Sequence, residues 1–155
     1  MDLKARIAAA REQLDSREPV VAPVDLGGEL ADVTLKPLEP QVWLDMVAAN
    51  PPRTASTDMN IGFNQDRICR DYPADRILVD GEPVDVETWQ ALFDVLASPS
   101  IRTVTAAAWS LNHNEADKRL RELGKARLAA SQKKRPSRST SASRSNGSKG
   151  GSRQK

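Results

Sequence analysis

The chain has 155 residues, enough for one domain with a modest core, and Leu, Val, Ile and Ala must build most of that core because only 4% of the residues are aromatic. The formal net charge of +2 at pH 7 conceals an asymmetry, since residues 131–155 carry eight Lys/Arg and no acid, whereas residues 1–130 are acidic. A single cysteine, Cys69, excludes a disulfide framework and a paired-cysteine metal site.

The N-terminal residues and the hydropathy pattern indicate the compartment. Residues 1–18 lack the apolar core of a secretory signal peptide. No apolar run approaches the length of a membrane span. We therefore expect a soluble intracellular protein.

Residues 1–16 predict an amphipathic helix, for which Asp2 is a possible N-cap. Its apolar residues recur at three- and four-residue steps: Leu3, Ile7, Ala10 and Leu14. The opposite face is charged. Two interpretations stay open, a surface helix that packs loosely on the body and a helix that binds a partner.

A connector follows this helix. Its prolines and the Gly27–Gly28 pair exclude a long helix between residues 16 and 40. We interpret residues 17–30 as a linker. The β-branched, partly alternating stretch "ADVTLKPL" predicts a short strand or extended arm at Val33–Leu35. A helical domain is expected over residues 31–130.

Two helices are predicted in the first half of this domain. The first spans Gln41–Ala49 and begins near Pro40. It ends at Asn50 because a residue that precedes a proline is driven out of the α region. After a polar loop, a second helix is expected from Ile61 to about Asp71.

The second half predicts three further helices. Asp85 is an N-cap for the clearest amphipathic helix, residues 86–97. Ser98–Pro99 opens the next helix, which we expect to end at Leu111. Asn114 is a possible cap for the last and highly charged helix, residues 115–130.

Sheet formation is expected to be minor. Asp80–Gly81 is a turn dipeptide, which we interpret as part of a two-stranded link rather than of a sheet. Residues 131–155 contain one apolar residue and eight serines, too little apolar surface to offset the entropy of ordering. The expected fold is mainly α: a small helical domain with short extended links, an N-terminal helix and a disordered basic C-terminal tail.

Few residues suggest catalysis. The chain has one histidine, His113, which we interpret as a solvated residue between two helices, and Cys69 as a small buried hydrophobe. No carboxylates follow a calcium-loop pattern, and Gly124–Lys125 lacks the earlier glycine of a phosphate-binding loop. We expect a protein that is not an enzyme and has no cofactor or metal site.

The basic tail leaves a nucleic-acid interpretation open. Clustered Lys/Arg bind phosphates, but a tail without aromatic residues predicts weak, salt-sensitive and sequence-independent binding. The acidic body would oppose close approach to a nucleic acid. A small accessory protein that binds nucleic acid through residues 133–155 is therefore the alternative, with the tail as a mere solubilising segment as the simpler view.

Three stretches contain short motifs in a distinctive order: "DVTLKPLEPQVWLDMVAANPPR", "IGFNQDRICRDYPADRI" and "VDVETWQALFDVLASPSIRTVTAAAWSLN". This order resembles the tail assembly chaperones of long-tailed (siphovirus-type) bacteriophages. In that family a "VTLRPL"-like arm leads into a helix with an early Trp, then an "HPPR"-like stop, a helix after "FN", a "-W--L---LS---" helix and a helix that ends in "LN".

The resemblance covers roughly residues 30–112. Asn50 stands where a small polar residue or His is expected before the prolines. The matching positions are Val33–Leu38, Trp43, Pro51–Arg53, Phe63–Asn64, Trp89, Leu92 and Leu111–Asn112.

The resemblance implies an interaction protein. Such chaperones bind the tape measure protein, a long helical chain with apolar stripes, and keep it soluble while tail tube subunits assemble around it. They need neither a catalytic centre nor a nucleotide. The implied place is the cytoplasm of the infected bacterial host, with the chaperone absent from the mature virion; self-association stays open.

A client helix needs apolar surface on which to lie. The predicted groove residues come from the two most apolar helices: Trp43, Met46, Val47, Trp89, Leu92 and Phe93. The alternative is that all six simply form the core of the domain.

The resemblance also implies a longer product made by a programmed ribosomal frameshift. Leu123-Gly124-Lys125 can be encoded as CTG GGA AAG, which contains the slippery heptamer G GGA AAG. Lys133–Lys134 is a second candidate. With slippage at Gly124–Lys125, residues 126–155 belong only to the short product, and the extension recruits the tail tube protein.

Overall fold

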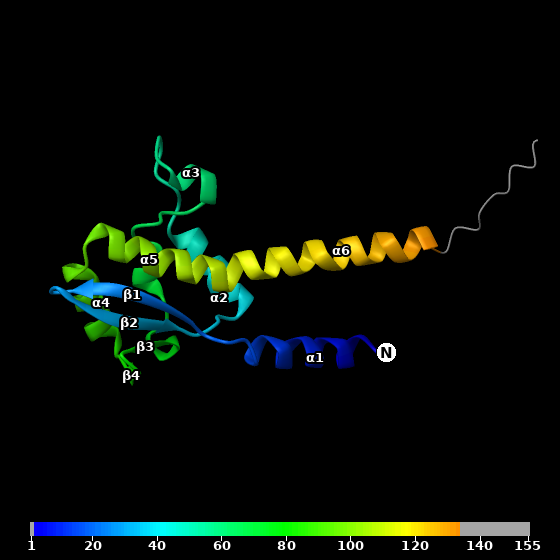
Figure 1. Cartoon of the computed structure of the whole chain (residues 1–155), viewed down its shortest axis with the longest axis horizontal. Helices are drawn as coiled ribbons and strands as arrows, with labels where there is room; N and C mark the ends of the chain where they lie inside the picture. Colours follow the sequence, from blue (N-terminus) through cyan, green and yellow to red (C-terminus); the bar gives the residue numbers. More distant parts are fainter. Residues whose placement is uncertain (1, 134–155) are drawn as a thin grey trace, which may run out of the picture. The chain divides into compact units, whose positions relative to one another are not determined.

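The structure is a computed structural model that describes residues 2–133 (Figure 1). The chain divides into two compact units, Met1–Leu120 and Arg121–Lys155, and the boundary falls within one helix. The elements are α1 (Leu3–Asp15), β1 (Val20–Leu26), β2 (Glu29–Leu35), α2 (Pro40–Ala49), α3 (Asp58–Ile61), the 3₁₀ helices η1 (Ile68–Asp71) and η2 (Ala74–Arg76), β3 (Ile77–Val79), β4 (Glu82–Pro83), α4 (Val86–Val95), α5 (Ser98–Trp109), the π-helical turn η3 (Ser110–Asn114) and α6 (Glu115–Lys133).

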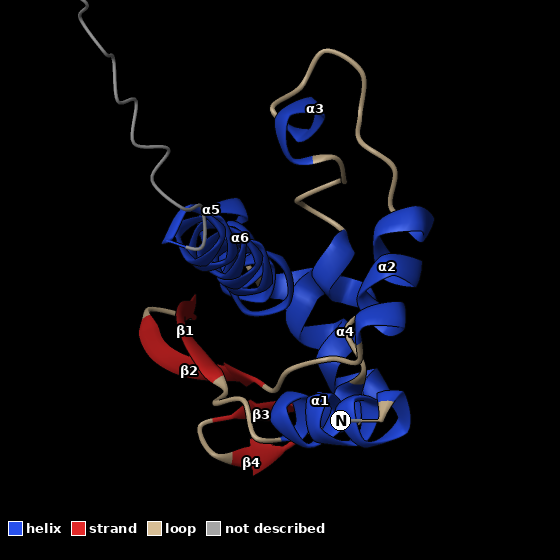
Figure 2. Cartoon of the chain, turned by 90° about the vertical axis from the view of Figure 1, so that its right-hand side faces the viewer, coloured by secondary structure: helices blue, strands red, loops and turns tan. Residues whose placement is uncertain are grey.

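The expectation of a mainly α fold is wrong. The structure is mixed α/β, 61% helical with a four-stranded antiparallel sheet in the order β1-β2-β3-β4 (Figure 2). The expected linker, residues 17–30, contains β1, which pairs with β2 along its whole length from Val20↔Leu35 to Leu26↔Glu29. The turn at Asp80–Gly81 is present with positive φ at both residues, but it joins β3 and β4 within the sheet.

Prolines protect both edges of this sheet. On the edge strand β1, Pro23 has no N–H, and the N–H of Asp25 donates to Ser100 Oγ of α5 at 3.0 Å. On the other edge, β4 is only two residues long and includes Pro83. Because strand addition requires a row of free donors and acceptors, these edges are poor templates for another strand.

The inner face of the sheet packs against α5 (Figure 1). Small side chains on α5 let the helix approach the strands closely, because alanine adds little bulk at the contact. The buried residues of this layer are Ala22, Val24, Ala31, Val33, Leu35, Val104, Ala107, Ala108 and Leu111. The core of the body is therefore aliphatic where the sheet meets α5.

A second part of the core is aromatic. Trp43 of α2 meets Phe63 edge to face with ring centroids 5.6 Å apart. Trp89 of α4 meets Phe93 in the same way at 5.0 Å. The indole Nε1 of Trp89 also donates to the carbonyl of Cys69 in η1 at 2.9 Å. The segment around η1 thus lies against both α2 and α4.

The prediction of one helix from Ile61 to about Asp71 is wrong. Ile61 is the last residue of α3, because Gly62 follows it in the left-handed conformation with φ +86°. Between Gly62 and Asp71, only Ile68–Asp71 is helical, as the short 3₁₀ helix η1. This irregular path lets Ile68 and Cys69 enter the core together.

The expected break before the last helix is also absent. The chain passes from α5 through the π-helical turn η3 directly into α6, and Asn114 does not cap it. Asn112 in this turn has an internal role instead. Its Oδ1 accepts from the N–H of Leu38 at 2.9 Å, and its Nδ2 donates to the hydroxyl of Tyr72 at 3.2 Å.

Other local expectations are confirmed. α2 begins at Pro40 and ends before Asn50, and α5 begins at Ser98. Asp85 caps α4, since its carboxylate accepts from the N–H of Thr88 at 2.7 Å. The N-terminal helix is present as α1.

Trp89→Ala should unfold a large part of the body. Trp89 is almost fully buried and holds η1 through its indole N–H, so truncation leaves a cavity and an unpaired carbonyl. We expect the free energy of unfolding to fall by about 3–5 kcal/mol in urea denaturation. Val86→Ala on the exposed side of the same helix is the control, with an expected change of about 0.5 kcal/mol or less. Equal stability of the two variants would contradict the packing described here.

Candidate functional site

The six predicted groove residues lie in the core or pack against it, and among them Trp43 also borders a surface groove described below. Four of them are buried, and the other two are partly buried against the same core. The alternative named with the prediction therefore fits the structure: α2 and α4 are amphipathic because one face of each packs within its own domain. The residues are Trp43, Met46, Trp89 and Phe93 (buried) and Val47 and Leu92 (partly buried).

Cys69 and His113 do not form a catalytic pair. The Cys69 thiol is fully buried, and desolvation raises its pKa to about 12, so it is protonated at neutral pH. His113 is exposed in η3 and stacks on Trp109 with ring centroids 5.7 Å apart. Within residues 2–133 no group of three or more His, Cys, Asp or Glu side chains is placed to hold a metal ion.

A buried carboxylate organises the loop between α2 and η1. Asp58 has no exposed surface, and its Oδ2 accepts from Arg53 Nε at 2.7 Å and from the Arg53 backbone N–H at 3.1 Å. Arg53 also pairs with Asp66 at 2.6 Å, and Arg102 of α5 holds the other oxygen of Asp66 at 3.1 Å. This chain of ion pairs ties the loop to α5.

The same ion pairs shift the pKa values of the carboxyls. The hydrogen bond from Arg53 holds the pKa of Asp58 well below its ordinary value. Arg102, and after it Arg53, lowers the pKa of Asp66. Both carboxyls are therefore ionised at neutral pH and act as fixed acceptors that hold the loop.

The motifs that carry the family resemblance contain residues that hold the fold together. "VTLKPL" contains the last three residues of β2, Val33–Leu35, and the Leu38 whose N–H donates to Asn112. "PPR" ends in Arg53, the partner of Asp58, and Phe63 of "FN" is the partner of Trp43. The resemblance thus concerns residues that build the fold.

Several helices expose apolar side chains, including Leu44 of α2 and Val95 of α4, but α1 and α6 expose them without burying any residue of their own. Neither α1 nor α6 contains a buried residue. On α1, Leu3 and Ile7 are 65% and 54% exposed. On α6, Leu120, Leu123 and Leu128 are 69%, 60% and 66% exposed, and we call these three leucines the α6 stripe. The sequence-based prediction favoured the more apolar helices α2 and α4, whose apolar faces the core occupies.

A shallow groove leads to the first leucine of the stripe. It has a volume of about 310 Å³ and lies between α2 and the start of α6. Leu44 of α2 is exposed at its wall. The lining residues are Pro40, Trp43, Leu44, Asn112, His113, Ala116, Asp117 and Leu120.

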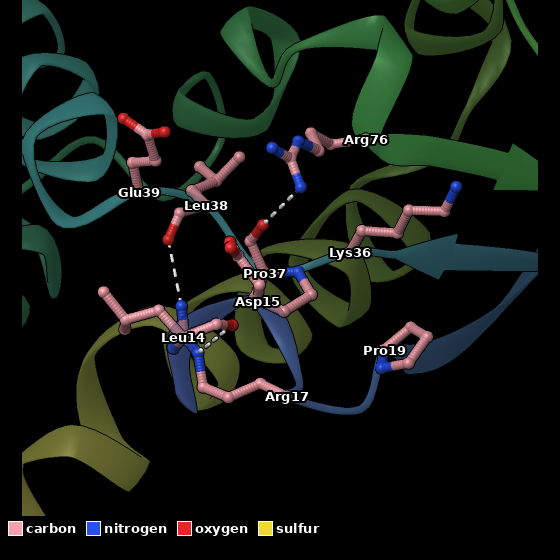
Figure 3. A pocket seen from close by; sticks show the side chains of 9 residues that line it. All are labelled: Leu14, Asp15, Arg17, Pro19, Lys36, Pro37, Leu38, Glu39 and Arg76. Carbon is pink, nitrogen blue, oxygen red and sulfur yellow. Dashed lines mark hydrogen bonds between the residues drawn. The ribbon is translucent and has the colours of Figure 1, made fainter. Parts of the chain in front are cut away.

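A second pocket lies at the base of α1 (Figure 3). Its volume is about 380 Å³, and it contains cations and carboxylates together. The guanidinium of Arg17 is engaged by backbone carbonyls, donating to Leu38 at 2.9 Å, Leu111 at 3.1 Å and Leu14 at 3.4 Å. Because its cation is bound internally, Arg17 anchors α1 to the body rather than offering an anion site.

The frameshift candidate lies within a helix. Gly124–Lys125 is in the middle of α6, between the second and third leucines of the stripe. α6 continues to Lys133, so the first three residues of the expected tail are helical. Residues 134–155, with the rest of the basic tail and its alternative role in nucleic-acid binding, lie outside the described residues.

The chain matches no protein-family model, no curated protein and no solved structure. From Asp2 to Lys133, no helix is both long enough and apolar enough to cross a membrane.

Asp58→Asn should lower the free energy of unfolding and also make it less dependent on pH in the acidic range. Because the pKa of Asp58 is depressed in the folded state, the carboxylate stabilises the protein above its unfolded pKa of about 4, and this contribution is lost as the pH falls below that value. We expect the variant to lose about 1.5–3 kcal/mol at pH 7 and to change less than the wild type on acidification. Urea denaturation at neutral and acidic pH measures this.

The exposed Asp75 supplies a matched control, Asp75→Asn, for which we expect near wild-type stability. If Asp58→Asn and Asp75→Asn behave alike at both pH values, the carboxylate does not organise the loop.

Proposed function

We propose that this protein is a tail assembly chaperone of a long-tailed bacteriophage. It binds the tape measure protein, keeps it soluble and helps to recruit tail tube subunits in the cytoplasm of the infected bacterium, without entering the mature virion. It acts by binding and has no catalytic centre. The order of motifs over roughly residues 30–112 supports membership of this chaperone family. The exposed α6 stripe supports binding of a client helix as the mode of action.

The observation that carries this proposal is the exposure of apolar residues on a helix without a buried residue. Exposed leucines contribute no burial free energy to folding, and three of them lie on α6: Leu120, Leu123 and Leu128. Full burial of one leucine side chain by a partner would contribute about 1.5–3 kcal/mol to the free energy of binding. A client helix that covers them gains several kcal/mol, part of which offsets the cost of association. Such a surface suits a helical client.

The protected sheet edges support the same mode of binding. A client that added a strand would need free backbone groups on β1 or β4, where Pro23 and Pro83 stand. The helices are the better surface. The groove between α2 and the start of α6, lined in part by Trp43, Leu44 and Leu120, offers further apolar surface on a helix.

The position of the proposed slippage point gives the two products different surfaces. Slippage at Gly124–Lys125 leaves Leu120 and Leu123 in both products and replaces the chain from residue 126 onward in the longer one. Both products would then bind the same client through the shared part of the stripe. The extension would supply the contact with the tail tube protein.

Leu120→Ser combined with Leu123→Ser should abolish solubilisation of the tape measure protein while leaving the fold intact. Both side chains are exposed, so the substitution removes client contact without opening a cavity. Co-expression followed by measurement of the soluble fraction of the tape measure protein tests this. Leu30→Ser is the matched control, because Leu30 is 79% exposed on the sheet.

The proposal fails if the double variant solubilises the tape measure protein as well as Leu30→Ser does. Deletion of residues 134–155 is a further arm. If this deletion alone abolishes activity, the nucleic-acid accessory role takes precedence over the chaperone.

Intact-mass measurement should reveal a longer product. The gene is expressed with an N-terminal tag and its natural downstream DNA, and we expect a minor species whose junction peptide maps between Leu123 and Lys134. Silent recoding of Gly124 and Lys125 to codons that cannot slip should remove it. Persistence of the longer species after recoding would exclude this slippage point, and a single species ending at Lys155 would exclude the frameshift.

A further inference from the structure

The spacing of the apolar residues on α1 describes the partner that fits it. They follow one another at steps of four, three and four residues, the spacing of a coiled-coil contact, and we call these residues the α1 seam: Leu3, Ile7, Ala10 and Leu14. We propose that α1 pairs with an acidic helix of another protein, whose own apolar residues cover the α1 seam and whose carboxylates meet the cations beside it. This inference does not rest on the proposed function, because α1 lies outside both the family resemblance and the α6 stripe.

The α1 seam is narrow and mostly exposed. At 100° per residue, its four residues fall within about 60° of the helix circumference. Leu3 and Ile7 are 65% and 54% exposed, Ala10 is exposed as well, and Leu14 is half-buried. A stripe this narrow has the width of a two-helix contact, whereas a helix that packs on the core of its own domain presents a wider apolar face. No residue of α1 is buried, so residues 2–133 leave the seam uncovered.

Cations border the α1 seam on both sides. Lys4 and Arg11 lie along one border and Arg6 along the other, the positions from which side chains of a coiled coil reach the partner helix. Within residues 2–133 these three side chains form no hydrogen bond or ion pair. The fourth border position is Gln13, which is engaged because its Oε1 accepts from Arg119 at 2.6 Å. Lys4, Arg6 and Arg11 are therefore available to a partner.

The acids of α1 lie away from the seam. From Leu3 to Arg11 the chain has three Lys/Arg and no acid. Glu12 lies on the opposite side of the helix, about 180° from Leu3. Asp15 belongs to the last turn and lines the pocket at the base of α1, and no ion pair joins it to Arg11 in the described chain. A partner with carboxylates along both borders would therefore be attracted, and a basic partner would be repelled.

The same cations disfavour pairing of α1 with α1 of a second copy. In a parallel pair, Arg6 of one helix would approach Arg11 of the other. In an antiparallel pair, Lys4 would approach Arg11. Both arrangements bring like charges together, so a helix of opposite charge is the better occupant.

An anionic membrane fits the α1 seam less well than an acidic helix does. Binding of an amphipathic helix to a bilayer depends on the apolar area that it inserts, and Leu3 and Ile7 are the only residues of α1 that are both large, apolar and exposed. α1 also contains no aromatic residue to anchor it at an interface. A partner helix covers the seam and pairs with its cations at the same time.

The body holds the last turn of α1 and leaves the preceding turns to a partner. Arg17, just beyond the helix, donates to the carbonyls of Leu38 and Leu111. Gln13 is held by Arg119. Because α1 is already formed and tied at this end, it loses less conformational entropy when a partner binds than a free peptide would.

Binding of two designed helical peptides to the full chain tests the inference. Both peptides carry leucines at coiled-coil spacing, with Glu at the border positions of one and Lys at the same positions of the other. We expect the Glu peptide to bind about tenfold more tightly in fluorescence anisotropy at physiological ionic strength, because about three favourable charge pairs replace three unfavourable ones. Equal affinities would overturn the inference.

Two double variants locate the contact. Leu3→Ala with Ile7→Ala removes the large side chains of the α1 seam and keeps every charge, and alanine preserves the helix. We expect this variant to bind the Glu peptide at least about tenfold more weakly, with an unchanged far-UV circular dichroism spectrum. Leu120→Ser with Leu123→Ser is the control, since it removes exposed apolar surface from α6 instead. Unchanged binding in the α1 variant, or lost binding in the α6 control, would contradict the proposal.

A charge reversal separates the border cations from the net charge of the chain. Arg6→Glu with Arg11→Glu should reverse the preference between the two peptides. Lys118→Glu with Lys125→Glu changes the net charge by the same amount on α6, and should preserve the preference. The inference fails if the α1 variant keeps the wild-type preference or if the α6 control reverses it.

Sedimentation and vesicle binding test the other occupants, and we expect neither to involve the α1 seam. Dimerisation of the wild type that Leu3→Ala with Ile7→Ala abolishes would assign the seam to a second copy. Tighter binding to anionic phosphatidylglycerol vesicles than to the Glu peptide, lost in the same variant, would assign it to a membrane. Either result would overturn the inference, whereas the proposed function is judged separately, by solubilisation of the tape measure protein through Leu120 and Leu123.

Discussion

The backbone of Leu38 is the point on which the arrangement of the body depends. Its N–H donates to Asn112 of the π-helical turn, and its carbonyl accepts from Arg17 at the end of α1. Arg17 also holds the carbonyl of Leu111, so three segments that are far apart in the sequence meet at one residue. This junction fixes where α1 leaves the body and where α6 begins.

The π-helical turn explains how one residue can serve this junction without ending the helix. An extra residue in the turn lets Asn112 point inward while α5 continues into α6. Through Asn112, which bonds to Leu38 and Tyr72, the turn holds α5 against the rest of the body. Beyond this turn α6 has no buried residue, and Arg119 near its start donates to Gln13 Oε1 of α1 at 2.6 Å.

The division of apolar residues follows from the size of the domain. A small body must place its largest side chains in the core to offset the entropy cost of ordering the chain, and Trp43 and Trp89 are buried for this reason. The leucines of α6, by contrast, lie on a helix without a buried residue and stay exposed. The proposed function uses these leucines, not the tryptophans.

Sequence alone determined the local features. Pro40 and the Asp85 cap mark helix starts, and Asp80–Gly81 marks a tight turn, because caps and turns depend on a few neighbouring residues. The sheet was missed since β1 contains Pro23 and its pairing with β2, like that of β2 with β3, depends on residues distant in the chain. Only the tertiary structure decided which apolar faces are covered. Burial depends on contacts between remote segments, and these contacts cover Trp43 of α2 and Trp89 of α4 but leave the three leucines of α6 exposed.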